Sequence, residues 1–157
     1  MLKVMGGHDF DDGVAGGGGH CFLMQLYKKL SVWRKSHALA LRVHSATTHL
    51  LALREYSLAA QLRRAAFSIP ANIAEGSGRT TSTQFAHFLQ IAIGSARELD
   101  YHLLLIRDLG LLAPTDHATL EARTEEVTKM LVSLRKTVTG RDKKHAPPKP
   151  RPRPPTP

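Results

Sequence analysis

Apolar residues recur at helical spacing in two segments of the first half of the chain. From about residue 31 to 50, and again from about 55 to 75, apolar side chains return every three or four residues, which places them on one face of a helix. Ser31 or a neighbour is expected to cap the first of these helices. The apolar positions are Val32, Leu39, Val43, Ala46 and Leu50 in the first segment, and Leu58, Leu62, Ala65, Ile69 and Ile73 in the second.

The second half of the chain predicts two longer helices. The third is expected from Thr81 or Ser82, which can cap it, to about Leu109, where Gly110 ends it. The fourth begins near Pro114 or Thr115, because proline suits a first helical turn. The third apolar stripe is Phe85, Phe88, Leu89, Ala92, Ala96, Leu99, Leu103 and Ile106, and the fourth is a heptad seam of Leu120, Thr124, Val127, Leu131, Leu134 and Val138.

Four helices with short links and no strand pattern predict an all-α fold, an antiparallel up-down-up-down four-helix bundle. The bundle is expected over residues 30–139. Residues 1–29 begin with a glycine-rich stretch and are expected to form a flexible leader. The alternative is that the first residues come from an upstream start codon and that translation starts at Met24. Residues 140–157 hold seven prolines and six Lys or Arg, which predicts a disordered, basic tail.

The second predicted helix has a proline in its interior. Pro70 removes one backbone donor and clashes with the carbonyl four residues back, which costs about 3 kcal/mol in a helix. We therefore expect a kink that the fold supports, with Ser68 and Asn72 bonding the freed backbone groups, or with Asn72 at a subunit interface. Gly76 and Gly78 are expected to end this helix.

The chain is strongly basic. Lys and Arg outnumber Asp and Glu by 22 to 13, and residues 21–139 alone carry a net charge of +6. Such a fold favours polyanions such as RNA, DNA or an acidic protein surface, although a soluble basic protein without these partners has the same balance. Arg63, Arg64 and Arg79 flank the proline and are the candidate phosphate contacts. The alternative is a solvated face with ion pairs, for example Glu75 with Arg79.

The remaining composition bears on location and on helix packing. Cys21 is the only cysteine, so an intrachain disulfide and a cysteine zinc site are excluded, which suits a reducing cytoplasm. No run approaches the roughly 18 apolar residues of a membrane span, and the N-terminus lacks a signal-peptide pattern. We expect a cytoplasmic protein without a membrane partner. The small residues Gly94, Ser95 and Ala96 are expected to let another helix approach closely, within or between subunits.

No catalytic or metal motif dominates the sequence. None of the nine histidines pairs at i, i+4 with a carboxylate third ligand, and no Ser-His-Asp set, acid/base carboxylate pair or phosphate loop is evident. The sequence therefore indicates no metal, cofactor or small-molecule substrate. Arg97-x4-His102 fits the Arg-x4–6-His pattern of helical RNases of the HEPN type. Arg42-x6-His49 is a second match, and about two such matches arise by chance.

The central segment carries a family resemblance. QLRRAA (61–66), SIPANIAEGSGR (68–79) and FAHFLQIAIGSARELDYHLLLIRDLGLL (85–112) resemble the four-helix-bundle family of the 23S rRNA intervening-sequence protein, also called the S23 family. The resemblance covers about residues 30–138. It departs from the family at HLLALREYSL (49–58), where a Phe-Pro pair is usual. The positions of the structural motif are Ser68, Pro70, Asn72, Glu75, Gly76, Gly78 and Gly94.

The resemblance implies a left-handed antiparallel bundle that assembles into a ring-shaped homo-oligomer, a pentamer, with no established catalytic activity. A distant similarity to the accessory variability protein of diversity-generating retroelements implies a basic surface for nucleic acid or for a reverse transcriptase. Three hypotheses follow. The chain is a non-enzymatic binder of nucleic acid or of a nucleic-acid enzyme, an RNase that uses Arg97 and His102, or a structural module whose proline-rich tail binds another protein.

Overall fold

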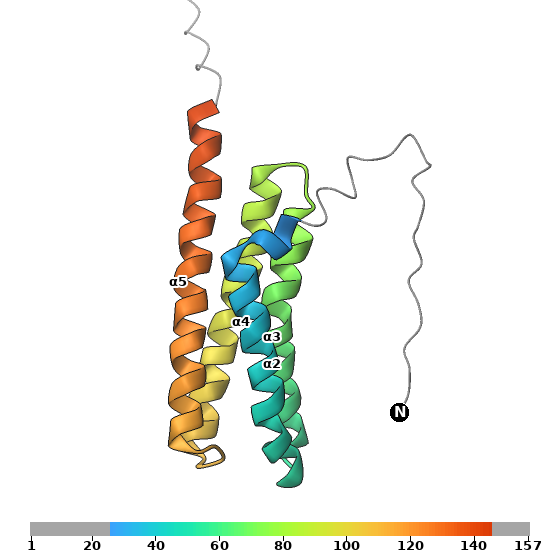
Figure 1. Cartoon of the computed structure of the whole chain (residues 1–157), viewed down its shortest axis with the longest axis vertical. Helices are drawn as coiled ribbons and strands as arrows, with labels where there is room; N and C mark the ends of the chain where they lie inside the picture. Colours follow the sequence, from blue (N-terminus) through green and yellow to red (C-terminus); the bar gives the residue numbers. More distant parts are fainter. Residues whose placement is uncertain (1–25, 146–157) are drawn as a thin grey trace, which may run out of the picture.

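Four antiparallel helices make up the part of the chain that the structure describes. The computed structural model describes residues 26–145, with side chains from residue 27 to 140. A 3-10 turn, η1 (Leu26–Lys29), precedes α2 (Ser31–Ala52), α3 (Tyr56–Ser77), α4 (Ser82–Asp108) and α5 (Pro114–His145). Successive helices run in opposite directions, and no strand occurs between residues 26 and 145 (Figure 1). The predicted all-α, up-down-up-down bundle is confirmed.

The predicted apolar stripes form the core. Each helix contributes side chains that are at most 1% exposed, among them Leu39, Ile69, Leu99 and Leu131. Burial of each such leucine or isoleucine contributes roughly 1.5–3 kcal/mol, so the core fixes how the helices face one another. A few stripe members at the edge of the core are only partly buried: Ala46, Leu58, Phe85, Phe88 and Leu134.

Two predicted helix ends are confirmed by local geometry. The Thr81 hydroxyl accepts a hydrogen bond of 3.2 Å from the backbone N–H of Gln84, which caps α4. At the other end of α4, Gly110 adopts a left-handed φ of 67° and donates its N–H to the carbonyl of Arg107. Glycine suits this position because it has no side chain to clash there.

The ends of α2 differ from the prediction. Ser31 is the first helical residue and does not cap it, because the N-cap is Leu30, which makes no side-chain cap bond. At the C-terminal end Arg54 takes the left-handed role with a φ of 63°, while the N–H of Glu55 donates to the carbonyl of Leu50 at 2.9 Å. An arginine therefore stands where many helices have glycine.

The proline of α3 is accommodated within one helix. Pro70 is buried, and the helix continues past it to Ser77. The Asn72 amide donates to the carbonyl of Ser68 at 2.8 Å and to the Ser68 hydroxyl at 3.0 Å. The carbonyl that Pro70 deprives of its donor is that of Ala66, four residues back. The prediction that Asn72 repairs this gap is therefore wrong, because its amide serves Ser68 instead.

The two glycines near the end of α3 have different roles. Gly76 lies inside the helix and is buried, and a Cβ built on it would come within 2.6 Å of the Phe88 Cβ. Its lack of a side chain lets α3 and α4 approach. Gly78 is the C-cap, but its φ of −85° is right-handed, so the geometry there does not require glycine. The expected end of the helix by both glycines is thus wrong for Gly76.

The small residues of α4 divide between two faces. Ser95 and Ala96 are buried, and the Ser95 hydroxyl lies 2.8 Å from that of Ser68 on α3. This contact confirms that a small residue lets a second helix approach within the chain. Gly94 is exposed, and a Cβ on it would meet nothing within 4 Å. Its small size is not used by any packing within the described chain.

The C-terminal helix extends beyond the predicted boundary at residue 139. α5 continues to His145, and its end projects past the turn between α3 and α4 (Figure 1). After Pro114, no proline occurs before Pro147, so nothing in the backbone forces the helix to end at Gly140. The predicted flexible leader covers residues 1–29, and it is wrong for its last four residues, which form the 3-10 turn η1. The rest of that leader and the predicted tail beyond residue 145 lie outside the described residues. No described helix has a segment long and apolar enough to cross a membrane.

Candidate nucleic-acid interface

Arg63, the first predicted phosphate contact, makes hydrogen bonds that link α3 to α2. Its Nε donates to the Thr47 hydroxyl at 2.8 Å, and its guanidinium donates to the His44 carbonyl at 3.3 Å. Thr47 is only 2% exposed, so this bond completes the bonding of a buried hydroxyl. The position of Arg63 is explained by helix packing.

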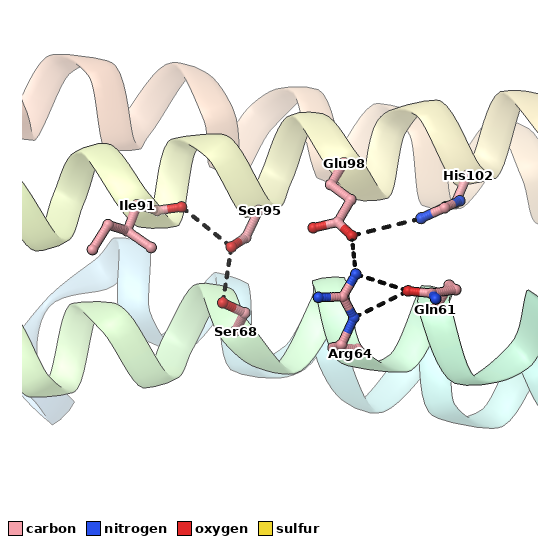
Figure 2. Close-up of polar contacts among 7 residues, drawn as sticks. All are labelled: Gln61, Arg64, Ser68, Ile91, Ser95, Glu98 and His102. Atoms are coloured by element: carbon pink, nitrogen blue, oxygen red, sulfur yellow. Dashed lines mark hydrogen bonds and ion pairs between the residues drawn. The ribbon is translucent and has the colours of Figure 1, made fainter.

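Arg64 lies on the opposite flank of α3, against α4. Its guanidinium donates to Gln61 at 2.8 Å and to Glu98 at 2.5 Å, and the Glu98 carboxylate lies 3.8 Å from the His102 ring (Figure 2). Two thirds of the Arg64 side chain is exposed, so the ion pair is largely solvated and weak. The side chain is nonetheless held along the α3–α4 seam.

Arg79 follows the C-terminal end of α3. It pairs with Glu75, as the ion-pair alternative predicts, and its guanidinium carbon lies 4.8 Å from the centre of the Phe88 ring. It also lines a cleft of about 490 Å³ at the α3–α4 turn. This position is about 20 Å along the helix from Arg64, at a rise of 1.5 Å per residue. The three arginines therefore do not form one patch.

The structure does not bring Arg97 and His102 together as an RNase pair. Five residues on a helix correspond to a rotation of about 140°, so the two side chains leave α4 in different directions. Arg97 is exposed, whereas the Nδ1 atom of His102 is buried without a hydrogen-bond partner among the described atoms. The other ring nitrogen of His102 faces Glu98. The HEPN-type enzymes use an Arg and a His across a dimer, so the RNase interpretation stays a prediction.

A different set of cations lines the seam between α2 and α5. Three clefts lie along this seam, and we refer to them together as the α2–α5 groove. The upper cleft, of about 320 Å³, is lined mainly by apolar and hydroxyl side chains, including Leu30, Met130 and Thr137. The middle cleft, of about 250 Å³, contains Arg34 and Arg123. The largest, of about 520 Å³, lies where α2 meets the start of α5, and we call it the corner cleft.

The three clefts follow one another in register. Ser31 lines both the upper and the middle cleft, and the α2 side continues one turn further into the corner cleft. One row of groove residues on α2 is spaced at three, four, three and four residues: Lys35, Ala38, Arg42, Ser45 and His49. Arg34 lies directly before this row in the middle cleft. A row on α5 follows the same spacing: Asp116, Thr119, Arg123, Glu126, Met130, Ser133 and Thr137. The helical spacing of each row was visible in the sequence, but the fact that the two rows face each other was not.

Cations along the groove are largely free of internal partners. Lys35 pairs with Glu126 across the groove, and Arg34 makes one long hydrogen bond of 3.5 Å to the carbonyl of Lys28. Arg42 and Arg123 have no ion pair or side-chain hydrogen bond within the described part of the chain. A free guanidinium is available to a phosphate oxygen, whereas one already bonded to a neighbour must give up that bond first.

Comparison with known proteins decides the family. The model of the 23S rRNA-intervening sequence protein family matches residues 28–133, about two thirds of the chain. The chain belongs to this family. The matched region contains α2, α3, α4 and the first two thirds of α5, and with them every cation of the α2–α5 groove. Residues beyond 133 lie outside the match.

A solved structure supports the same assignment. A protein of unknown function from the S23 ribosomal protein family of Bacteroides thetaiotaomicron VPI-5482 is 27% identical in sequence and superposes with a TM-score of 0.65. The match covers 67% of this chain and 98% of that protein. No curated protein matches the chain. The family and the helical fold are thus established, and the comparisons name no catalytic activity.

A further surface of this S23-family chain is one side of α4, where several large apolar side chains are exposed. The side of α4 that faces away from the other helices presents Ile91, Tyr101 and Leu104, with exposures of 39%, 58% and 41%. Gly94 lies on the same side of the helix. We call these four residues the outer α4 face. Such a group of exposed large apolar side chains is typical of a surface that contacts another protein.

Metal chemistry has no obvious location in the described chain. Among the side chains of residues 27–140, no three His, Cys, Asp or Glu gather closely enough to hold a metal ion. His117 is buried, and its nearest carboxylate, that of Glu121, lies 3.8 Å away. This histidine packs within the core of the bundle.

Proposed function

We propose that this protein is a non-enzymatic, oligomeric four-helix bundle that binds nucleic acid, RNA or DNA, along the α2–α5 groove. The observation that carries the proposal is the row of Arg34, Arg42 and Arg123 in adjoining clefts. Two of them have no ion pair or side-chain hydrogen bond with a described residue, and the third makes only a long bond. A strand in this groove would replace water around these guanidiniums with phosphate oxygens. The single cysteine of the sequence supports a cytoplasmic location.

The charges favour the α2–α5 groove as the phosphate-binding site over the three arginines predicted from the sequence. Arg63, Arg64 and Arg79 each have a bonded partner on the protein, so phosphate binding there would compete with existing contacts. In the groove the carboxylates are Glu126, which Lys35 neutralises, and Asp116 at one end. Phosphate contacts of this kind bind without reading sequence, and their strength falls as salt rises.

The experiment compares two sets of three substitutions that remove the same charge. The groove variant is R34Q/R42Q/R123Q, and the control variant is R54Q/R107Q/K136Q, whose side chains line none of the three clefts. Binding of fluorescent RNA and DNA oligonucleotides is measured by anisotropy between about 50 and 200 mM salt. The groove variant should lower the slope of log K against log salt by about 2 to 3, and the control by less than 1.

Two results would contradict the proposal. If the unaltered protein binds neither RNA nor DNA at 50 mM salt, the nucleic-acid function is wrong, and a structural or protein-binding role gains support. If both variants lose affinity equally, the basic protein binds through its overall charge and the groove has no special part. The RNase alternative is tested by incubating the protein with the same RNA oligonucleotides and analysing them on a gel. Cleavage that is lost in H102A would favour an RNase.

Self-association through the outer α4 face completes the proposed function. Exposed apolar side chains on one side of α4 lie beside Gly94, where no described residue occupies the space of a side chain. A helix of a second copy could therefore approach this face closely. A heterologous contact of this kind, repeated with rotation, closes into a ring such as the pentamer implied by the family resemblance.

A further inference from the structure

The corner cleft contains two opposite charges that do not meet. Arg42 from α2 and Asp116 from the first turn of α5 both line this cleft, yet they form no ion pair with each other or with another described residue. His49, seven residues after Arg42, lines the same cleft. At 1.5 Å per residue, Arg42 and His49 are separated by about 10 Å along the helix axis. The cleft thus presents cationic and acceptor groups on different walls.

The floor of the corner cleft is apolar. Ala46, Leu112 and Leu120 form part of its lining, while Ser45 and Thr119 supply hydroxyl groups at the sides. A volume of about 520 Å³ lies within the range of sites that hold small organic ligands. A flat group could therefore lie on the floor while charged groups at either end hold an anion and a hydrogen-bond donor.

From this arrangement we propose that the corner cleft binds one nucleotide, with its phosphate on Arg42 and its base against Asp116. The carboxylate of Asp116 accepts hydrogen bonds from base N–H groups, as carboxylates do from the amino group of cytosine. Guanine presents two adjacent N–H donors to the two carboxylate oxygens, whereas uracil presents one. The site therefore favours bases that carry an amino group, and guanine most of all.

This inference rests on the proposed function, because a strand that follows the groove would deliver one nucleotide into the cleft. It adds base preference to binding that otherwise depends only on phosphates. A free nucleotide has the same chemistry, so the source is distinguished by comparing 5′-GMP with oligonucleotides. A strand in the groove binds more tightly than the mononucleotide because Arg34 and Arg123 hold further phosphates.

The decisive variant is Asp116→Asn, because two models predict opposite signs for it. If the cleft contributes only positive charge, removal of a carboxylate strengthens binding of every oligonucleotide. If Asp116 holds the base, the variant weakens binding of a guanine-containing oligonucleotide by about 5- to 10-fold, which corresponds to one good base contact. Binding of oligouridine should then change by less than about 2-fold, because it depends mainly on phosphate contacts.

Two further variants separate the cleft from general electrostatics. Arg42→Gln should weaken binding of 5′-GMP and of the guanine-containing oligonucleotide, whereas Lys136→Gln, which removes the same charge outside the cleft, should not affect 5′-GMP. Ser45→Leu places bulk in the cleft from an exposed position without a change of charge, and should abolish 5′-GMP binding. Thermal unfolding of each variant verifies that it is folded.

The outcomes distinguish this inference from the proposed function. Oligonucleotide binding that requires the groove arginines but grows stronger in Asp116→Asn overturns the nucleotide site and leaves the groove intact. Binding of 5′-GMP that needs Arg42 and Asp116, without binding of any oligonucleotide, supports the site and overturns the groove. Equal loss in Arg42→Gln and Lys136→Gln overturns the site. Loss of guanine preference in Asp116→Asn supports it.

Discussion

At the scale of single residues, Gly76 sets how closely α3 and α4 approach. Its backbone lies against Phe85 and Phe88, so any side chain there would enter space that aromatic atoms already fill. Sequence reasoning found the glycine and attributed it to the end of a helix. The caps at Thr81 and Gly110 were predicted correctly because they depend on the local chain. The role of Gly76 depends on residues of the next helix, which local rules do not describe.

Replacement of Gly76 by alanine should lower stability. A Cβ at 2.6 Å from the Phe88 Cβ and 2.9 Å from the Phe85 ring forces the helices apart, and such overpacking typically costs about 1–3 kcal/mol. Urea denaturation followed by circular dichroism measures the loss. Gly78→Ala is the matched control, since its Cβ would meet only the Glu75 carbonyl at 3.6 Å and its φ suits alanine. Equal stability of G76A and the unaltered protein would refute the steric account.

At the scale of elements, a short chain of hydrogen bonds joins α3 to α4. Asn72 donates to the Ser68 hydroxyl. Ser95 donates to the carbonyl of Ile91 at 3.2 Å, which leaves Ser68 to donate to Ser95 (Figure 2). Both serine hydroxyls in this series of hydrogen bonds thus donate one bond and accept one. The sequence indicated that Ser68 and Asn72 were structural, but it attributed their bonding to Pro70 within one helix. Pairing across helices follows from their relative rotation, which the stripes determine only to within a residue.

A double-mutant cycle on Ser68 and Ser95 tests this link. Each single change to alanine should cost about 1 kcal/mol in the free energy of unfolding, because the remaining serine loses a partner in a partly buried site. The double variant should be less destabilised than the sum of the two singles by about 0.5–1 kcal/mol. Strict additivity within error would show that the two hydroxyls do not interact.

At the scale of the whole molecule, the fold follows from the sequence more completely than its surfaces do. The periodic stripes predicted all four helices and their antiparallel order, because burial of a stripe allows few arrangements. The α2–α5 groove escaped prediction although both of its rows have helical spacing. Each row alone resembles an ordinary solvated face. Only the return of α5 beside α2 turns them into facing walls of one groove.

The outer α4 face leads to a prediction about mass in solution. Gly94→Leu places a bulky side chain where a second copy is proposed to approach, so the oligomer should dissociate to monomers or dimers in light scattering after size exclusion. Gly140→Leu is the control, because a Cβ on Gly140 also meets nothing within 4 Å and the residue lies on α5. The unaltered protein should have a mass about five times that of one chain. A monomeric mass for the unaltered protein would end the ring proposal.

The α2–α5 groove also has a consequence for the order in which the chain folds. The other neighbouring helices are joined by links of a few residues, so their contacts form locally and quickly. The walls of the groove meet only after about 60 intervening residues have folded, which makes this the contact with the largest closure entropy. We therefore expect the groove to be the seam at which the bundle opens first. A nucleic-acid strand bound in the groove should hold α2 against α5. It should therefore slow amide hydrogen exchange in α2 and α5 more than in α3 and α4.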